Sequence, residues 1–247
     1  MQGVVCPMCV RFAPQRQFYA PIVTLLLIVA CCGAFGYDLT HMQQLSFGDG
    51  PQVVAGESID NLGQLTLYAP SLEADGEWYR TATAGLVHFG WTHITMNMIL
   101  LFLVGRLIEG RYGALPFITL FGAGLLGGSL GAVLLDYKSQ VGGASGAVLG
   151  LLGALAVLQK MSGRGLVRSG IGPLIVLNIA LSLLPNVSLG GHLGGLAAGV
   201  VGGLMLGVAE RMGPRASSLG PIAICALAFA AFAATIPAAR WALEQGV

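Results

Sequence analysis

Residues 192–210 read HLGGLAAGVVGGLMLGVAE, an apolar stretch that opens with a histidine and closes with a glutamate. No other ionisable side chain lies between His192 and Glu210. A helix of about twenty apolar residues spans the hydrocarbon core of a bilayer. We therefore predict a transmembrane helix here, with a polar side chain placed close to one membrane face.

Similar apolar blocks occur along the rest of the chain. The 247 residues are 55% hydrophobic and 9% charged, whereas soluble domains carry roughly 25% charged residues. The predicted fold class is an all-α, multi-pass membrane protein. Its expected spans are seven: 20–37, 93–109, 115–135, 145–160, 171–186, 192–210 and 219–239.

Basic residues flank these spans unequally, and their distribution predicts the orientation. The side that holds the N-terminus carries nine: Arg11, Arg16, Arg106, Arg111, Lys160, Arg164, Arg168, Arg211 and Arg215. The opposite side carries Arg80, Lys138 and Arg240. By the positive-inside rule the N-terminus is expected in the cytoplasm and the C-terminus outside. The net charge is +1, and the sequence has no cluster of Lys and Arg residues that could bind along a phosphate backbone. No nucleic-acid partner is therefore expected.

The N-terminal segment offers two weaker patterns. Cys6 and Cys9 have the spacing of half a zinc site, but a structural zinc needs four ligands and no second pair follows nearby. No metal site is therefore expected. The residues up to Cys31 loosely resemble a lipidated signal peptide. We expect a retained signal-anchor, because six more spans follow.

Polar side chains inside a membrane are costly and usually functional. They gather here at the predicted outer ends of three spans: His88, His93 and Asn97 around the second, Ser145 at the start of the fourth, and His192 at the start of the sixth. Taken one at a time, each could cap a helix, bond a loop or line a transport path. Their shared depth predicts a single cavity.

A serine needs an adjacent base to become a nucleophile, and His192 is the expected base for Ser145. Neither span carries an acid that could orient the histidine, so the sequence predicts a dyad rather than a triad. Ser145 opens a helix, where free backbone N–H groups favour a developing oxyanion. The Ser145 amide and the side chains of His93 and Asn97 are the predicted oxyanion donors.

Glycines explain how the two helices could approach each other. Gly146 and Gly150 lie four residues apart on one span, and Gly195 and Gly199 lie four apart on the other. Small residues at this interval line one helix face and let backbones pack closely. The same spacing is also an ordinary packing device in membrane bundles. We expect these two faces to meet and to bring Ser145 and His192 to one depth.

Five motifs follow one another between residues 77 and 210. They are EWYR at 77–80, His88 with HITMN at 93–97, GRLIEGRYG at 105–113 (GxxxExxxG), GASG at 143–146 (GxSG) and HLGGLAAG at 192–199 (HxxGxxxG). In this order they resemble the rhomboid family of intramembrane serine proteases. Two positions depart from the family pattern. Leu149 stands where many members have a tyrosine that packs on the histidine ring, and Tyr79 separates Trp78 from Arg80.

The resemblance implies a rhomboid-like six-helix catalytic core over 20–210, containing a long outer loop at 38–91. A cytoplasmic segment at 1–19 and one extra C-terminal transmembrane helix at 211–247 complete the expected domains. It implies Ser145 as nucleophile, His192 as base, and Arg80 as a brace of the outer loop. Glu109 is expected to tie the inner helix ends to Arg111 or to backbone groups. Supporting roles are implied for His88, Gly143, Gly146, Gly195 and Gly199, and the span at 171–186 is the expected mobile wall that admits substrate.

The resemblance also implies the activity: a serine endopeptidase that cleaves transmembrane helices of single-pass proteins near the outer face, without metal or cofactor. Expected partners are those substrates and membrane lipids, most simply in a bacterial inner membrane. The oligomeric state is not indicated. Two alternatives stay open: an inactive rhomboid-like protein that binds or escorts membrane clients, and a transporter or channel, although no internal repeat is evident.

Overall fold

A computed structural model describes residues 19–41 and 63–245 of the chain. The regular secondary structure of the described residues is helical apart from one two-stranded antiparallel sheet. The long helices are α2 (Ile22–His41), α5 (Trp91–Tyr112), α6 (Ala114–Leu135), α7 (Ser145–Met161), α8 (Ile171–Leu181), α9 (Leu189–Met212) and α10 (Pro214–Gln245). The connection between α2 and α5 holds η1 (Gly63–Leu65), β1 (Leu67–Tyr68), α3 (Ala69–Ala74), α4 (Arg80–Thr83) and η2 (Ala84–Leu86), and β2 is Gln140–Val141.

A long helix is found in each of the seven predicted spans, which confirms the all-α membrane fold. Five of them, α2, α5, α6, α9 and α10, are long and apolar enough to cross a bilayer by length and composition. The helices α7 and α8 are apolar but shorter, with 17 and 11 residues. Large side chains such as Val29, Phe229 and Val176 are exposed on the outside of the bundle, as expected for a surface that faces lipid. The protein is therefore a multi-pass membrane protein.

The fifth span is shorter than the sequence predicted. Its helix α8 ends at Leu181 instead of near residue 186. The Ser182 hydroxyl donates to the Asn178 carbonyl at 2.8 Å, one turn back. Pro185 lacks the N–H that a continuing helix needs. Asn186 has a φ of 64°, which turns the chain toward α9.

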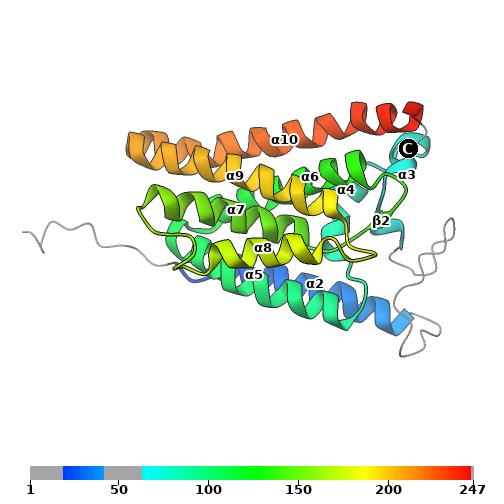
Figure 1. Ribbon diagram of the computed structural model, residues 1–247, viewed down its shortest axis with the longest axis horizontal. Coiled ribbons are helices and arrows are strands. Elements are labelled where there is room, and N and C mark those ends of the chain that lie inside the picture. The colour runs from blue at the N-terminus through cyan, green and yellow to red at the C-terminus, as the bar shows by residue number, and fades with distance from the viewer. Residues whose placement is uncertain (1–18, 42–62, 246–247) are drawn as a thin grey trace, which may run out of the picture.

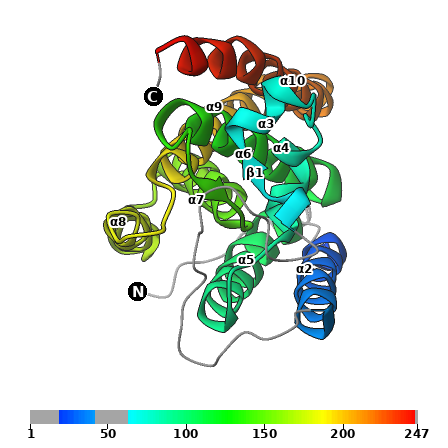
Figure 2. The same ribbon diagram turned by 90° about the vertical axis from the view of Figure 1, so that its right-hand side faces the viewer.

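The helix α7 lies inside the bundle. It contacts α5, α6, α8 and α9, and Leu149, Leu151 and Leu152 are fully buried. A helix that is apolar on all sides belongs in a core. Figures 1 and 2 show α10 along one side of the bundle and α2 and α5 along the opposite side, with α7 between them. The first residues of α7 are therefore packed between helices on both sides, although Ser145 itself is half-buried.

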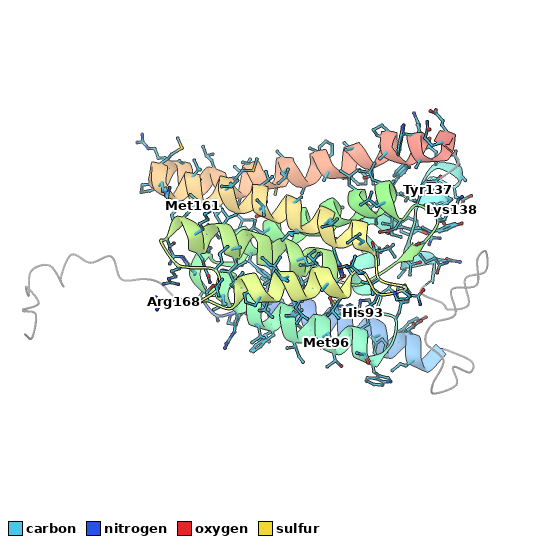
Figure 3. The ribbon with its side chains drawn as sticks, viewed as in Figure 1. His93, Met96, Tyr137, Lys138, Met161 and Arg168 are labelled. Carbon is cyan, nitrogen blue, oxygen red and sulfur yellow. The ribbon has the colours of Figure 1, made fainter. Side chains whose placement is uncertain are left out.

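Two single-residue turns connect consecutive long helices. Gly113 alone separates α5 from α6, and Gly213 alone separates α9 from α10. Their φ angles are 86° and 105°, a region that favours glycine. Figure 3 places Met161 and Arg168 at one end of the bundle, and Tyr137, Lys138 and the C-terminal end of α10 at the other. The orientation relative to a membrane and the domain boundaries remain predictions.

Candidate active site

The starts of α7 and α9 come together because glycines let the two backbones touch. A Cβ added to Gly195 would meet the Gly146 backbone, and a Cβ added to Gly199 would meet the Gly150 backbone. A Cβ on Gly146 would in turn lie 3.3 Å from the Gly191 carbonyl oxygen. Ser145 adjoins Gly146 and His192 adjoins Gly191. The contact therefore brings Ser145 and His192 to the same level of the bundle.

Ser145 is the first residue of α7 and is half-buried. The N-cap is Ala144, whose side chain cannot satisfy the amides of the first turn. Such free N–H groups, at the positive end of the helix dipole, can donate hydrogen bonds to an anionic oxygen. Among the described residues no hydrogen bond joins Ser145 to His192. Catalytic hydrogen bonds are often longer in ligand-free structures and tighten when substrate binds.

His88 holds the loop that precedes Ser145. Its Nδ1 lies 3.1 Å from the Leu86 carbonyl, and its Nε2 lies 3.3 Å from the Ala144 amide nitrogen. A carbonyl accepts and an amide donates, so both bonds are satisfied only by a neutral ring with its proton on Nδ1. Burial, and less strongly the nearby His93 ring, lower the pKa of His88 to about 4. His88 thus stays neutral at physiological pH and fixes the Ala144 amide.

His93 and Asn97 lie on one face of α5, directed at the same loop. His93 Nδ1 accepts from the Phe89 amide at 3.3 Å, so the neutral ring carries its proton on Nε2. A Cβ added to Gly143 would lie 2.6 Å from that Nε2 and 3.8 Å from Asn97 Nδ2. Asn97 Nδ2 donates one hydrogen to the His93 carbonyl at 3.0 Å and keeps a second. Two side-chain donors therefore converge two residues before Ser145.

Gly143 is required there for two reasons. Its φ is 113°, which strains any residue with a Cβ. Its missing side chain also leaves the space that His93 Nε2 occupies. Figure 3 shows His93 in the half of the bundle toward Lys138 and away from Arg168. The site therefore lies toward the end that the charge distribution predicts to be outside.

His192 sits one turn into α9, and a capping network holds that turn. Ser188 Oγ accepts from the Gly191 amide at 2.9 Å and donates to Asp136 Oδ2 at 2.6 Å. Asp136 Oδ2 also accepts from the Gly190 amide at 2.9 Å. The His192 ring is buried, and its Nδ1 is hydrogen-bonded to the Ser182 hydroxyl. Sequence reasoning missed Ser182, although a serine inside an apolar block was a visible signal.

The connection between α2 and α5 is tied to the site through the small sheet. Arg80 is buried, and its guanidinium donates to the Thr66 carbonyl at 3.0 Å and to Glu77 at 2.6 Å. Thr66 precedes β1, which pairs with β2, and β2 leads directly into Gly142 and Gly143. Arg80 therefore braces a connection that reaches the residues before Ser145. The loop residues 42–62 lie outside the described part of the chain.

Glu109 lies near the far end of α5 and joins it to α2. Its carboxylate accepts from the Val23 and Thr24 amides, each at 2.8 Å, and from the Thr24 hydroxyl at 2.6 Å. Of the two expected partners, the backbone groups are found. Arg111, the other expected partner, pairs with Glu210 at 3.3 Å instead. Acidic groups at a helix N-terminus satisfy its free amides and complement its dipole.

Metal ligands do not gather in the described part of the chain. No group of three or more His, Cys, Asp or Glu side chains there could hold a metal ion. The two cysteines at 6 and 9 lie outside the described residues. The described site thus consists of a serine, three histidines, an asparagine and close glycines.

Comparison with known proteins identifies the family of this chain. The Rhomboid domain family model matches residues 75–209, more than half of the chain, so the protein belongs to the rhomboid family. That family typically consists of intramembrane serine proteases. This conclusion confirms the resemblance found in the sequence motifs.

Similar curated proteins carry the same family name. The chain is 34% identical over 169 residues to the rhomboid protease GluP of Bacillus subtilis, covering 66% of this chain and 32% of GluP. It is 32% identical over 162 residues to RHOMBOID-like protein 5 of Arabidopsis thaliana, covering 62% and 52%. It is 31% identical over 134 residues to the putative rhomboid protease YdcA of Bacillus subtilis, covering 51% and 66%. The chain thus spans about a third of GluP and about half of the plant protein.

Proposed function

We propose that this chain is an intramembrane serine endopeptidase that cleaves transmembrane helices of single-pass membrane proteins near the outer membrane face. The observation that carries the proposal is the convergence around one glycine loop. His93 Nε2 and Asn97 Nδ2 approach Gly143 from α5, while the α7–α9 contact brings His192 to the level of Ser145. A nucleophile, a base and oxyanion donors are the parts that acyl transfer needs.

In the proposed reaction the Ser145 hydroxyl attacks the carbonyl carbon of the scissile peptide bond. His192 Nε2 takes the hydroxyl proton as the Oγ–C bond forms, and then gives it to the amide nitrogen as the C–N bond breaks. Water attacks the resulting acyl-enzyme by the same route and restores Ser145. Because Ser145 and His192 are not yet hydrogen-bonded, substrate binding must draw them together.

The negative oxygen that develops on the substrate needs hydrogen-bond donors already in place. The tautomer of His93 directs an N–H toward the loop at Gly143, and Asn97 has one N–H to spare. The Ser145 amide at the start of α7 is the third proposed donor. Removing one such donor typically lowers kcat by about 10²–10³-fold.

The substrate must expose a peptide bond to Ser145. Amides in a helix are hydrogen-bonded internally, so we propose that cleavage requires local unwinding close to the outer membrane edge. Helix-breaking or small residues there should favour cleavage. The short helix α8 is the proposed wall through which a substrate enters. Its first residue, Ile171, is buried, whereas Val176, Leu177 and Leu181 are exposed.

Cleavage of a labelled transmembrane reporter in proteoliposomes tests the proposal. We expect cleavage by wild type and loss of cleavage in Ser145→Ala and His192→Ala. Ser162→Ala is a matched control, because Ser162 caps the opposite end of α7 and its hydroxyl bonds only the Leu158 carbonyl. Equal cleavage by Ser145→Ala and wild type would contradict the proposal.

A second candidate is a rhomboid-like protein that binds or escorts membrane clients without cutting them. The observation in its favour is the missing hydrogen bond between Ser145 and His192. This candidate predicts no cleavage by folded wild type for any reporter, together with client binding that Ser145→Ala leaves unchanged. Co-purification of a client with both forms, compared side by side, separates the two candidates.

The membrane and its orientation are part of the proposal. We propose a bacterial inner membrane, which suits the compact loops of the chain. We propose that the N-terminus lies in the cytoplasm and the C-terminus outside, because the basic residues gather on one side of the spans. The proposed partners are membrane lipids and transmembrane substrates, and the reaction as written uses only side chains, backbone amides and water.

A further inference from the structure

The second ring nitrogen of His192 has a partner that the dyad does not explain. Nδ1 is hydrogen-bonded to the Ser182 hydroxyl. Both side chains are buried, with 8% of His192 and 3% of Ser182 exposed. Ser182 caps the C-terminal end of α8, on an element separate from Ser145 and His192. The end of α8 and the first turn of α9 therefore meet at this imidazole.

The hydrogen-bond network fixes which atom donates. Ser182 Oγ donates to the Asn178 carbonyl at 2.8 Å, and a carbonyl oxygen can only accept. A hydroxyl has one proton, so Ser182 Oγ must accept from His192 Nδ1–H. A neutral imidazole has one ring proton, which leaves Nε2 with a free lone pair. That is the state a general base needs.

We propose that Ser182 is a positioning residue that holds His192 in its Nδ1–H tautomer and aims Nε2 at Ser145. The inference rests on the proposed protease function for its kinetic consequences, but the tautomer itself does not. When Nε2 takes the Ser145 proton, the imidazolium keeps its Nδ1–H donated to Ser182, and Nε2 later passes its proton to the leaving amide nitrogen. Ser182 itself neither gains nor loses a proton.

Among the described residues, no other side chain is hydrogen-bonded to the His192 ring. The Asp136 carboxylate is engaged through Oδ2 with Ser188 and the Gly190 amide. Leu149, one turn after Ser145, has no polar atom that could orient an imidazole. Helix capping alone does not explain the contact between Ser182 and His192. The Ser162 hydroxyl makes the same one-turn bond at the end of α7, also at 2.8 Å, without contacting a histidine.

Kinetics of three variants test the role. Ser182→Ala should lower kcat about tenfold, the factor expected for losing one ordinary hydrogen bond, with little change in KM. Ser182→Thr keeps the hydroxyl and should restore most of the activity. Ser162→Ala removes an equivalent capping bond and should leave kcat unchanged. A Ser182→Ala enzyme with wild-type kcat, or a loss of kcat in Ser162→Ala equal to that in Ser182→Ala, would overturn the proposal.

The ¹⁵N shifts of the histidine rings give a readout that needs no cleavage. The chain has four histidines, so the His192 signals can be assigned as those missing from His192→Asn. In Ser145→Ala protein we expect His192 protonated on Nδ1, and in Ser145→Ala/Ser182→Ala a shift toward the Nε2–H form. A mainly Nε2–H ring with Ser182 present would refute the inference. Because this result does not depend on activity, it is distinguishable from a failure of the protease proposal.

Discussion

The backbone contact between α7 and α9 makes a quantitative prediction for Gly199→Ala. The added Cβ would lie 2.5 Å from the Gly150 Cα and closer still to the Gly150 carbonyl oxygen. Ordinary contact begins at 3.4 Å, so the helices must separate by roughly 1 Å or more. Nothing flexible can give way, because all three of the nearest atoms are backbone atoms of Gly150.

Two consequences follow from this separation. Overpacking a close interface costs about 1–3 kcal/mol of unfolding free energy. A misplacement of about 1 Å between reacting groups can also lower a rate by about 10²-fold. Gly199→Ala should therefore lose both stability and cleavage, because it moves the α9 helix that carries His192 away from Ser145.

Gly122→Ala is the matched control, since it adds the same methyl group to a helix. A Cβ at Gly122 would meet nothing within 4 Å. Alanine is favoured over glycine within helices by about 1 kcal/mol, so this variant should be as stable as wild type or more stable. Thermal unfolding in detergent and reporter cleavage in proteoliposomes measure both effects. Equal stability of the two variants would refute the close α7–α9 contact.

Three further predictions concern residues around the site. Glu109→Gln should destabilise the fold less than Glu109→Ala, because the alanine leaves two amides of α2 without their acceptor, at a cost of about 1–3 kcal/mol of unfolding free energy for each amide. Unfolding measurements check this difference. The kcat per folded molecule should not change in either variant, because Glu109 lies far from Ser145. Gly143→Ala should fold with about 1–3 kcal/mol of backbone strain, because the φ of residue 143 is positive. Its kcat should fall at least about tenfold, because the added Cβ displaces the His93 side chain. A kcat equal to that of wild type would show that His93 is no oxyanion donor. Folding lowers the pKa of His88 from 6.5 to about 4, so the unfolded state binds the proton more readily, and the stability that His88 contributes should fall as the pH drops from about 6.5 to about 4. The difference in unfolding free energy between wild type and His88→Asn should therefore shrink as the pH is lowered across this window. A difference that does not change with pH would contradict this prediction.

Much of the fold could be predicted because its determinants are local. Apolar blocks of membrane-spanning length predicted where each long helix lies, and glycines four residues apart predicted which faces of α7 and α9 touch. The end of α8 was predicted several residues too late. Its position depends on a capping bond from Ser182 and on the turn at Asn186, neither of which changes the hydropathy of the block.

The side-chain partners were harder to predict because they depend on packing between distant elements. The pairing of Arg111 with Glu210 rather than Glu109 joins α5 to α9 across 99 residues of sequence. The hydrogen bond between His192 and Ser182 likewise depends on how α8 packs against α9. Motif spacing indicated which residues share a membrane depth, and only the packed structure shows which atoms meet.

The most direct test of the central claim is where a serine-reactive fluorophosphonate attaches. We predict one covalent adduct on wild-type protein, located by mass spectrometry on the peptide that contains Ser145. The adduct should be lost in His192→Ala and retained in Ser162→Ala. Labelling of Ser145 that is equal with and without His192, or an adduct only on other residues, would contradict the proposed Ser145–His192 pair.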